Sequence, residues 1–416
     1  MLRTTTVALC ALLVLACQRQ GISAYADLPS FDSSDPAPWD VPSYETNAHD
    51  DSAAFDFRPS LDIKTTDSAE TKTTADIHQA EVTAEIESLF DGHTAELLAD
   101  TSDTTPPACT CGAPDAPCLI GHTSFTIESD THPDLPAVVF YPACSSSEDA
   151  PVAFGHHPVF IFGHGYQQSV ADYQYIWEAL VPLGIIVALP DRLTAAAEIN
   201  IDGFADDFLH ITAALAMWNL DSDSIFYRRV SGKIAVGGHS TGGGASLIAA
   251  SDMRPGFTPT AVVVLAPLGT LDKKPMTGPY PLDAAAVLHS PTLLQEAQFD
   301  CILLNELNSQ PIWSNIPLNT PAWMAALIDG DHCGFTWIDG PLLWLCEAAE
   351  KGLCWDFAND VSTQPPTMGS ALQNDLALTL AVPFLSWQLL GDSTAEVQFE
   401  QVLEHPEYEW ASHSTD

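Results

Sequence analysis

Short apolar runs alternate with amphipathic segments between residues 118 and 395. Continuous runs rich in Val, Ile and Leu, typical of buried parallel strands, recur at residues 158–162, 185–189, 234–236, 261–265, 292–294 and 324–328. Helical spacing is found at residues 172–183, 206–220, 245–250 and 375–390, and residues 125–127 with 137–141 predict an initial hairpin. Such alternation requires right-handed crossovers. We therefore predict an α/β fold with a mainly parallel central sheet and helices on both faces.

The segments outside this region have a different pattern. Residues 18–107 are rich in Ser, Thr, Asp, Pro and Ala and have few large apolar residues. A chain of this composition cannot bury enough apolar area to offset its conformational entropy, so we predict a disordered acidic linker. Residues 396–416 are predicted to form a C-terminal tail. The sequence contains no internal repeat, and no gap in the pattern separates a second compact domain.

The N-terminus has the pattern of an export signal over residues 1–17. Arg3 precedes an apolar run at residues 7–16 that is too short to span a bilayer. Residues 14–17 (VLAC) resemble the bacterial lipobox, which predicts lipidation of Cys17; cleavage after residues 24–26 (AYA) is the alternative. Both predict export, either to the bacterial envelope (periplasm or cell surface) with a lipid anchor or into the medium.

The charge balance limits the partners. The chain has 13 Lys and Arg against 55 Asp and Glu, a formal net charge of −42. Nucleic acid is excluded as a partner because its binding depends on basic residues. Anionic membrane surfaces would repel the protein in the same way, so membrane contact is expected only through the lipid anchor.

Cysteine usage agrees with export. Of ten cysteines, Cys10 and Cys17 lie in the leader, and eight remain. An even number in an exported protein predicts disulfides, but eight cysteines allow 105 pairings. The pair Cys109 and Cys111 has no second pair at zinc-ligand spacing, so we predict neither a metal nor a cofactor.

The sequence around Ser240 has the pattern of a nucleophile elbow. An apolar strand ends in Gly238-His-Ser-Thr-Gly242, and an alanine-rich helix follows directly. A serine on such a sharp strand-to-helix turn presents its hydroxyl and has a strained backbone. Glycines are needed beside it because a Cβ would collide with the neighbouring strand or helix. We predict that Ser240 is a nucleophile.

A serine nucleophile needs a base and a carboxylate that orients the base. In sheets of this type the acid and then the histidine follow the serine, each at a strand end. Asp300 follows the run at 292–294, and His332 follows the run at 324–328. His239 is expected to be structural, because the elbow directs it away from the hydroxyl. The remaining alternatives are His164 and His289 for the base, and Asp191, Asp329 and Asp331 for the acid, the last two being turn candidates.

An oxyanion hole requires backbone N–H donors. One is expected from Thr241, which follows the nucleophile. The other is expected from the loop at residues 163–166 (GHGY), where Tyr166 would supply the amide and glycines allow close approach to a substrate.

These motifs resemble a branch of the α/β-hydrolase superfamily, the one that holds platelet-activating-factor acetylhydrolases, chlorophyllases and cutinase-like polyester hydrolases. The similar stretches are residues 158–166, 183–191, 238–244, 291–294 and 332–335, within a resemblance that covers residues 122–391. The resemblance implies an α/β-hydrolase fold and a serine esterase. It implies Ser240, Asp300 and His332 as the triad, with the Tyr166 and Thr241 amides as oxyanion donors. We assign residues 108–395 to this catalytic domain.

The chain also departs from that branch. Thr241 stands where cutinase-like enzymes usually have Met, and residues 269–289 and 336–367 look inserted. These departures leave open whether the substrate is a small ester, a lipid or a polyester. We expect a monomer. A thioesterase or acyltransferase using the same triad, and a non-catalytic binding protein on a hydrolase scaffold, are the alternative functions.

The positions of four cysteines in the sequence suggest two disulfide bonds. Cys301 follows the predicted acid and Cys333 follows the predicted base, so a bond between them would join the two loops. A bond between Cys346 and Cys354 would close the second insertion.

Overall fold

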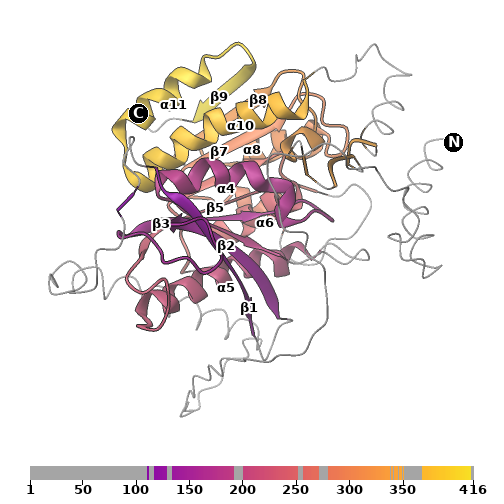
Figure 1. Ribbon diagram of the computed structural model, residues 1–416. Helices are drawn as coiled ribbons and strands as arrows, with labels where there is room; N and C mark the ends of the chain where they lie inside the picture. Colours follow the sequence, from indigo (N-terminus) through magenta and orange to yellow (C-terminus); the bar gives the residue numbers. More distant parts are fainter. Residues whose placement is uncertain are drawn as a thin grey trace, which may run out of the picture. The chain divides into compact units, whose positions relative to one another are not determined.

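A nine-stranded mixed sheet runs through the protein (Figure 1). The structure is a computed structural model. It describes residues 110–111, 117–128, 134–191, 200–251, 256–270, 280–337, 339–340, 342–344, 346–348, 350 and 368–413. The predictions for the signal at 1–17, for Cys17, for cleavage after residues 24–26 and for the linker at 18–107 lie outside these residues.

The strands lie in the order β1-β2-β4-β3-β5-β6-β7-β8-β9. The six from β3 to β8 are parallel, while β1 and β2 at one edge and β9 at the other pair antiparallel. Their bounds are β1 Leu119–Ile127, β2 Leu135–Ala143, β3 His157–Gly163, β4 Ile186–Pro190, β5 Val230–His239, β6 Ala261–Leu265, β7 Thr292–Ala297, β8 Ala322–Leu327 and β9 Tyr408–His413. The predicted hairpin is confirmed, since Ile127 pairs with Leu135.

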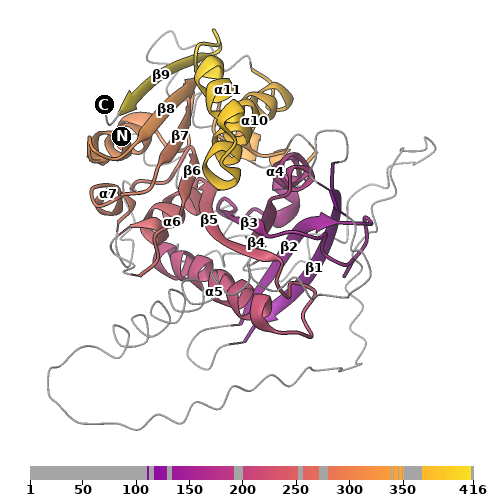
Figure 2. The same cartoon turned by 90° about the vertical axis from the view of Figure 1, so that its left-hand side faces the viewer.

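Helices cover both faces of the sheet, as Figure 2 shows. Apolar residues of α5 to α8 form a core cluster with one face, and those of α4, α10 and α11 form a second cluster with the other. The bounds are α4 Gln174–Leu180, α5 Ile201–Leu220, α6 Thr241–Ala250, α7 Pro281–Ala285, α8 Ser309–Asn315, α10 Ser370–Leu385 and α11 Ser393–Leu403. The short helices are η1 Val170–Tyr173, η2 Val181–Leu183, η3 Asn305–Leu307, η4 Cys333–Phe335 and the π-helical η5 Ser386–Leu390. The predicted α/β class and mainly parallel sheet are confirmed.

The sheet reverses its winding between β3 and β5. The chain passes from β3 through α4 to β4 on one side, and from β5 through α6 to β6 on the other. Because α4 and α6 lie on opposite faces, the loops after β3 and β5 diverge. In open α/β sheets, ligands bind outside the carboxyl ends of the strands at such a switch point. Ser240 lies at this position, directly after β5.

The predicted domain boundary at residue 395 is wrong. Residues 393–403 form α11, which buries Ala395, Phe399 and Leu403 at a spacing of four residues. β9 then pairs with β8, with Tyr408 opposite Leu327. Residues 396–413 therefore belong to the domain. The polar edge strand was missed because only its pairing partner, far away in sequence, makes it a strand.

All four predicted helices have different bounds. The one at 245–250 begins at Thr241, and the one at 375–390 begins at Ser370 and is divided into α10 and η5. The segment at 172–183 is divided into η1, α4 and η2, and it stops at Gly184, whose φ of 98° ends the last turn. The helix predicted at 206–220 begins five residues earlier, because the Asn200 side chain accepts a hydrogen bond from the Gly203 amide and caps it.

Candidate active site

Ser240 occupies a strained turn between β5 and α6. Its φ and ψ are 55° and −116°, and residues other than glycine rarely adopt a backbone conformation with such a positive φ. Three backbone hydrogen bonds hold this conformation: the Ser240 amide donates to the Leu265 carbonyl (3.0 Å), and the Ser240 carbonyl accepts from the amides of Gly244 (3.0 Å) and Leu268 (2.8 Å). The predicted strand-to-helix turn with a strained serine backbone is confirmed, and the role of Ser240 as a nucleophile stays a prediction.

Glycines let the elbow pack against β3. A Cβ on Gly242 would lie 2.1 Å from the carbonyl oxygen of Gly163, and a Cβ on Gly238 would lie 2.4 Å from the carbonyl carbon of Gly242. Side chains at either position would therefore push α6 away from the end of β3. The predicted reason for these glycines is confirmed, and the contact brings the loop after β3 next to the start of α6.

Asp300 and His332 lie together at the ends of β7 and β8. The His332 Nδ1 is 2.7 Å from the Asp300 Oδ2. The other Asp300 oxygen accepts hydrogen bonds from the amides of Ile302 (3.0 Å) and Leu303 (2.6 Å). The Asp300 Oδ2 is placed to accept a hydrogen bond from the Nδ1–H of His332, and in that tautomer the lone pair of the imidazole lies on Nε2.

The electrostatic surroundings of His332 favour its charged form. Burial lowers the pKa of the imidazole, but the charge and hydrogen bond of Asp300 oppose burial, as do the nearby carboxylates of Glu350 and Asp331. The balance raises the pKa above its usual value. A histidine of this kind is a stronger base than a free imidazole.

The elbow and the imidazole are neighbours, but they are not joined. The ring of His332 packs against that of His239, the residue before Ser240, with centroids 4.6 Å apart. Ser240 and His332 are both described in full, and no hydrogen bond links the Ser240 hydroxyl to the imidazole. Catalytic hydrogen bonds of this type often close only when substrate binds. The Ser240 residue is 7% exposed.

Two residues of α10 hold the loop that carries His332. The Gln373 side chain accepts from the Asp331 amide (3.0 Å) and donates to the Asp331 carbonyl (2.7 Å). The side-chain Nδ2 of Asn374 donates to the backbone carbonyls of Gly334 (2.8 Å) and Thr336 (3.2 Å). These bonds fix the loop backbone on both sides of the imidazole.

The proposed oxyanion loop is held by a buried polar network that the sequence did not reveal. The Gly165 amide donates to the Tyr173 hydroxyl (2.9 Å), which in turn contacts Gln168 and the Nδ1 of His239 (2.7 Å). Gln168 donates to the Thr336 hydroxyl at 2.6 Å, which ties this loop to the one after His332. The roles of the Tyr166 and Thr241 amides stay predictions. Thr241 is the first residue of α6, which is the position that the predicted role of its amide requires.

The alternative residues occupy other places. His239 is a buried part of the network just described, and burial followed by the proximity of His332 lowers its pKa well below the usual value. His164 is buried with its Nδ1 2.9 Å from the Gly165 carbonyl. His289 precedes β7, at the opposite end from Asp300.

Of the alternative acids, two are turn residues, as expected. Asp329 has a φ of 58°, and Asp331 accepts a hydrogen bond from the Gly334 amide (2.6 Å). Asp191 follows β4, and its amide donates to the carbonyl of Pro136 on β2.

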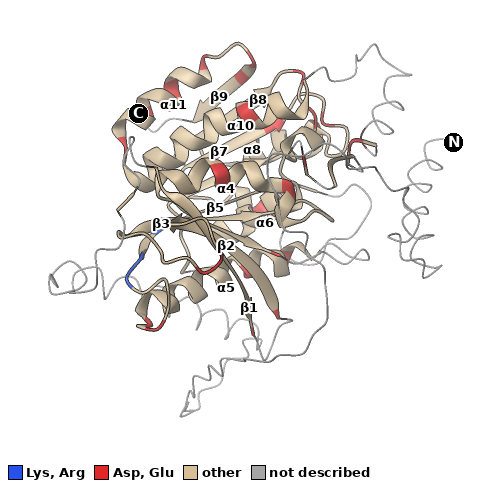
Figure 3. Cartoon of the chain, in the orientation of Figure 1, with Lys and Arg blue, Asp and Glu red and all other residues tan. Residues whose placement is uncertain are grey.

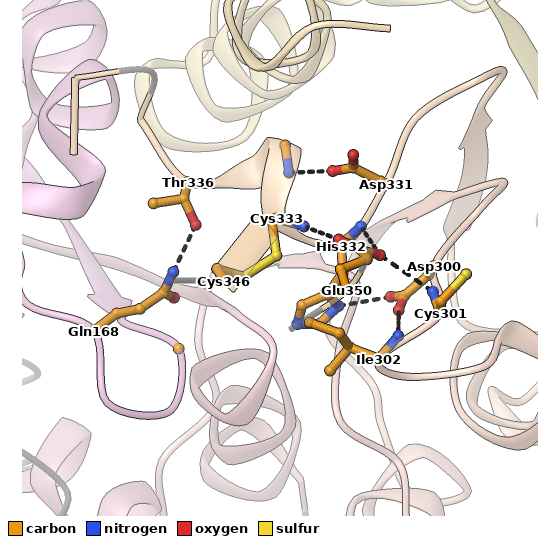
Figure 4. The surroundings of a disulfide bond; sticks show 12 residues. Gln168, Asp300, Cys301, Ile302, Asp331, His332, Cys333, Thr336, Cys346 and Glu350 are labelled. Carbon is orange, nitrogen blue, oxygen red and sulfur yellow. Dashed lines mark hydrogen bonds and ion pairs between the residues drawn. A yellow bond between two sulfur atoms is a disulfide. The ribbon is translucent and has the colours of Figure 1, made fainter. Parts of the chain in front are cut away.

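Both disulfide hypotheses are wrong. Cys333 is bonded to Cys346, which excludes bonds from Cys333 to Cys301 and from Cys346 to Cys354. A second disulfide joins Cys111 to Cys118, and Cys301 also takes part in a disulfide. The observed bond ties the residue after His332 to the inserted segment, as shown in Figure 4. Spacing alone could not select this pairing, since it depends on how the insertion folds back.

The inserted segment docks beside the proposed oxyanion loop. The Trp337 amide donates to the carbonyl of Asp172 (2.7 Å), and the Leu342 amide donates to the carboxylate of Asp172 (3.0 Å). Trp344 in the same segment is 68% exposed. Trp323, by contrast, packs against the second core cluster, where its ring contacts that of Phe384.

Positive side chains are absent from the candidate site as far as the structure describes it. The described Lys and Arg residues are Arg228, Arg229 and Lys233, which lie before β5 and in its first half, while Asp and Glu residues occur in many parts of the described chain (Figure 3). Within the described ranges, no group of three or more His, Cys, Asp or Glu could hold a metal ion.

No helix within the described parts of the chain is long and apolar enough to span a membrane. The disulfides are compatible with an exported protein, because such bonds persist in oxidising compartments. In comparisons with known proteins, neither the family models nor the curated proteins that were searched match the chain.

Proposed function

We propose that the protein is an exported serine hydrolase with an α/β-hydrolase fold that cleaves carboxylic esters. The observation that carries the proposal is the combination of a strained serine at the switch point of the sheet with a buried histidine–aspartate pair at two neighbouring strand ends. The winding of the sheet and the order serine, acid, histidine along the chain support the same fold and class.

The reaction proceeds in two halves. In the first, the Ser240 Oγ attacks the ester carbonyl carbon and His332 Nε2 takes the hydroxyl proton. Asp300 stabilises the resulting imidazolium. The tetrahedral intermediate collapses as its ester C–O bond breaks, and His332 gives the proton to the departing alcohol. In the second half, His332 takes a proton from water, the hydroxide attacks the acyl-enzyme, and Ser240 leaves with its proton restored.

The Thr241 and Tyr166 amides are assigned to the developing oxyanion. Each donor of this kind contributes about 2.7–4 kcal/mol to transition-state stabilisation. The close approach of Gly242 in α6 to Gly163 at the end of β3 supports this assignment.

The substrate is assigned by class: an ester of small or medium size, or the ester group of a lipid or polyester. Thioester hydrolysis and acyl transfer would use the same residues, so they are separate outcomes of the substrate screen. We also propose that the protein acts as a monomer, held at the envelope through the lipid on Cys17 when that signal is used.

Loss of the nucleophile tests the proposal. Ser240→Ala is expected to abolish hydrolysis of p-nitrophenyl esters and reaction with a fluorophosphonate probe, because both need the Oγ. Ser246→Ala is the matched control, since Ser246 lies two turns along α6 and its hydroxyl bonds to the Gly242 carbonyl. Equal labelling of wild type and Ser240→Ala would refute the nucleophile. Absence of labelling in the wild type would favour a non-catalytic binding protein.

A further inference from the structure

Glu350 is a buried carboxylate behind the His332–Asp300 pair. It is 2% exposed and lies in the inserted segment, four residues after Cys346. Figure 4 shows it between the loop that carries Asp300 and the loop that carries His332. The sequence provides no motif for it.

The carboxylate of Glu350 is bound by three backbone amides from the two loops. One oxygen accepts from the amides of Cys301 (3.2 Å) and His332 (2.9 Å), and the other accepts from the amide of Cys333 (3.0 Å). Cys301 directly follows the proposed acid, and Cys333 directly follows the proposed base. A single side chain therefore joins the backbones of both catalytic loops.

We infer that Glu350 is a positioning residue of the triad, which holds the acid loop and the base loop in register and places a second negative charge beside His332. This inference rests on the proposed function for its catalytic meaning. The link between the two loops, which a Cys301–Cys333 disulfide was expected to supply, is made by hydrogen bonds to Glu350. The Cys333–Cys346 disulfide anchors the segment that carries it.

The chemistry of the three contacts favours an anion. All three donors are amides, so a protonated carboxyl would turn its own O–H towards an N–H. The pKa of Glu350 is raised to about 7: burial and the charges of Asp331 and Asp300 raise it, while His332 and the Cys333 amide partly oppose them. Proton uptake by Glu350 at mildly acid pH would therefore weaken the link.

The charge matters because His332 becomes an imidazolium in the transition state. Glu350 and Asp331 both act with Asp300 to favour that cation. A merely structural acceptor would hold the loops without affecting the proton affinity of the imidazole. Glu350→Gln removes the charge and also turns an NH2 group towards a backbone N–H, so the pKa of His332, which responds to the charge, is the readout that separates these two roles.

The test compares Glu350→Gln with Asp339→Asn, a control that removes an exposed acidic charge from the same inserted segment. NMR of histidine-labelled protein follows the titration of His332, assigned with His332→Gln. Glu350→Gln is expected to lower the pKa of His332 by about one unit, and Asp339→Asn is expected to leave it unchanged. This readout needs no catalysis, so it stays decisive even if the proposed esterase activity is absent.

Activity gives the second readout. If the protein is an esterase, Glu350→Gln should lower kcat by about 10–100-fold with a small change in KM, and shift the acid limb of the kcat/KM profile to lower pH. An unchanged pKa of His332 overturns the inference. If Glu350→Gln does not fold, Glu350→Asp is used. It keeps the charge but reaches one methylene less far, so the pKa of His332 should stay close to the wild-type value while hydrogen exchange of the Cys301, His332 and Cys333 amides becomes faster; unchanged exchange overturns the inference.

Discussion

Substitution of Gly242 by alanine tests the packing that supports the elbow. The added Cβ would lie 2.1 Å from the Gly163 carbonyl oxygen, whereas ordinary contacts of this kind are 3.4 Å or longer. The end of β3 and the start of α6 would therefore have to separate by about 1.3 Å. Overpacking of this kind costs about 1–3 kcal/mol of unfolding free energy. A displacement of about 1 Å at catalytic groups can lower the rate about 100-fold.

Both effects can be measured on the same preparations. Urea unfolding followed by tryptophan fluorescence gives the stability, and p-nitrophenyl ester hydrolysis with fluorophosphonate labelling gives the reactivity of Ser240. Gly369→Ala is the control, because no atom lies within 4 Å of the Cβ it would add. If Gly242→Ala matched this control in both stability and reactivity, the close contact between β3 and α6 would not be what positions the elbow.

Two further predictions concern stability. Burial, followed by the charges of nearby carboxylates, raises the pKa of Glu296 to about 7. The native state thus binds this proton more tightly than the unfolded state, and stability falls as pH rises from about 4.5 to 7. Glu296→Gln should remove that penalty, so its advantage in urea midpoint should grow from pH 5 to pH 8; a pH-independent difference contradicts this reasoning. Replacement of both Cys333 and Cys346 by Ser should lower the unfolding free energy by about 3 kcal/mol and slow ester hydrolysis, because the segment that carries Glu350 loses its anchor. The same change at Cys111 and Cys118, which lie before β1, should leave hydrolysis unaffected, and equal activity loss in both variants would count against the anchoring role.

Local patterns in the sequence predicted much of the fold. The run at residues 261–265 is β6 with the predicted bounds, and the glycines around Ser240 predicted a strained turn that the structure contains. These features depend on neighbours in sequence: continuous β-branched runs favour buried strands, and only glycine fits where two backbones touch. The pairing of Asp300 with His332 was also predictable, because both follow parallel strands whose carboxyl ends lie at one edge.

Other features depend on residues that meet only in the folded chain. A polar strand at 408–413 is stable because β8 offers it an edge, and the sequence had placed it in a tail. Cys333 pairs with Cys346, although adjacency in the chain favoured other partners. Glu350 binds three amides from two loops through a carboxylate that no local pattern distinguishes from the other acidic residues of this chain. The sequence by itself determined the sheet, the elbow and the proposed triad, because these follow from periodicity and strand ends. Only the tertiary structure decided the pairing and the buried carboxylate that hold the loops, because those contacts form between segments whose approach is set by the whole fold.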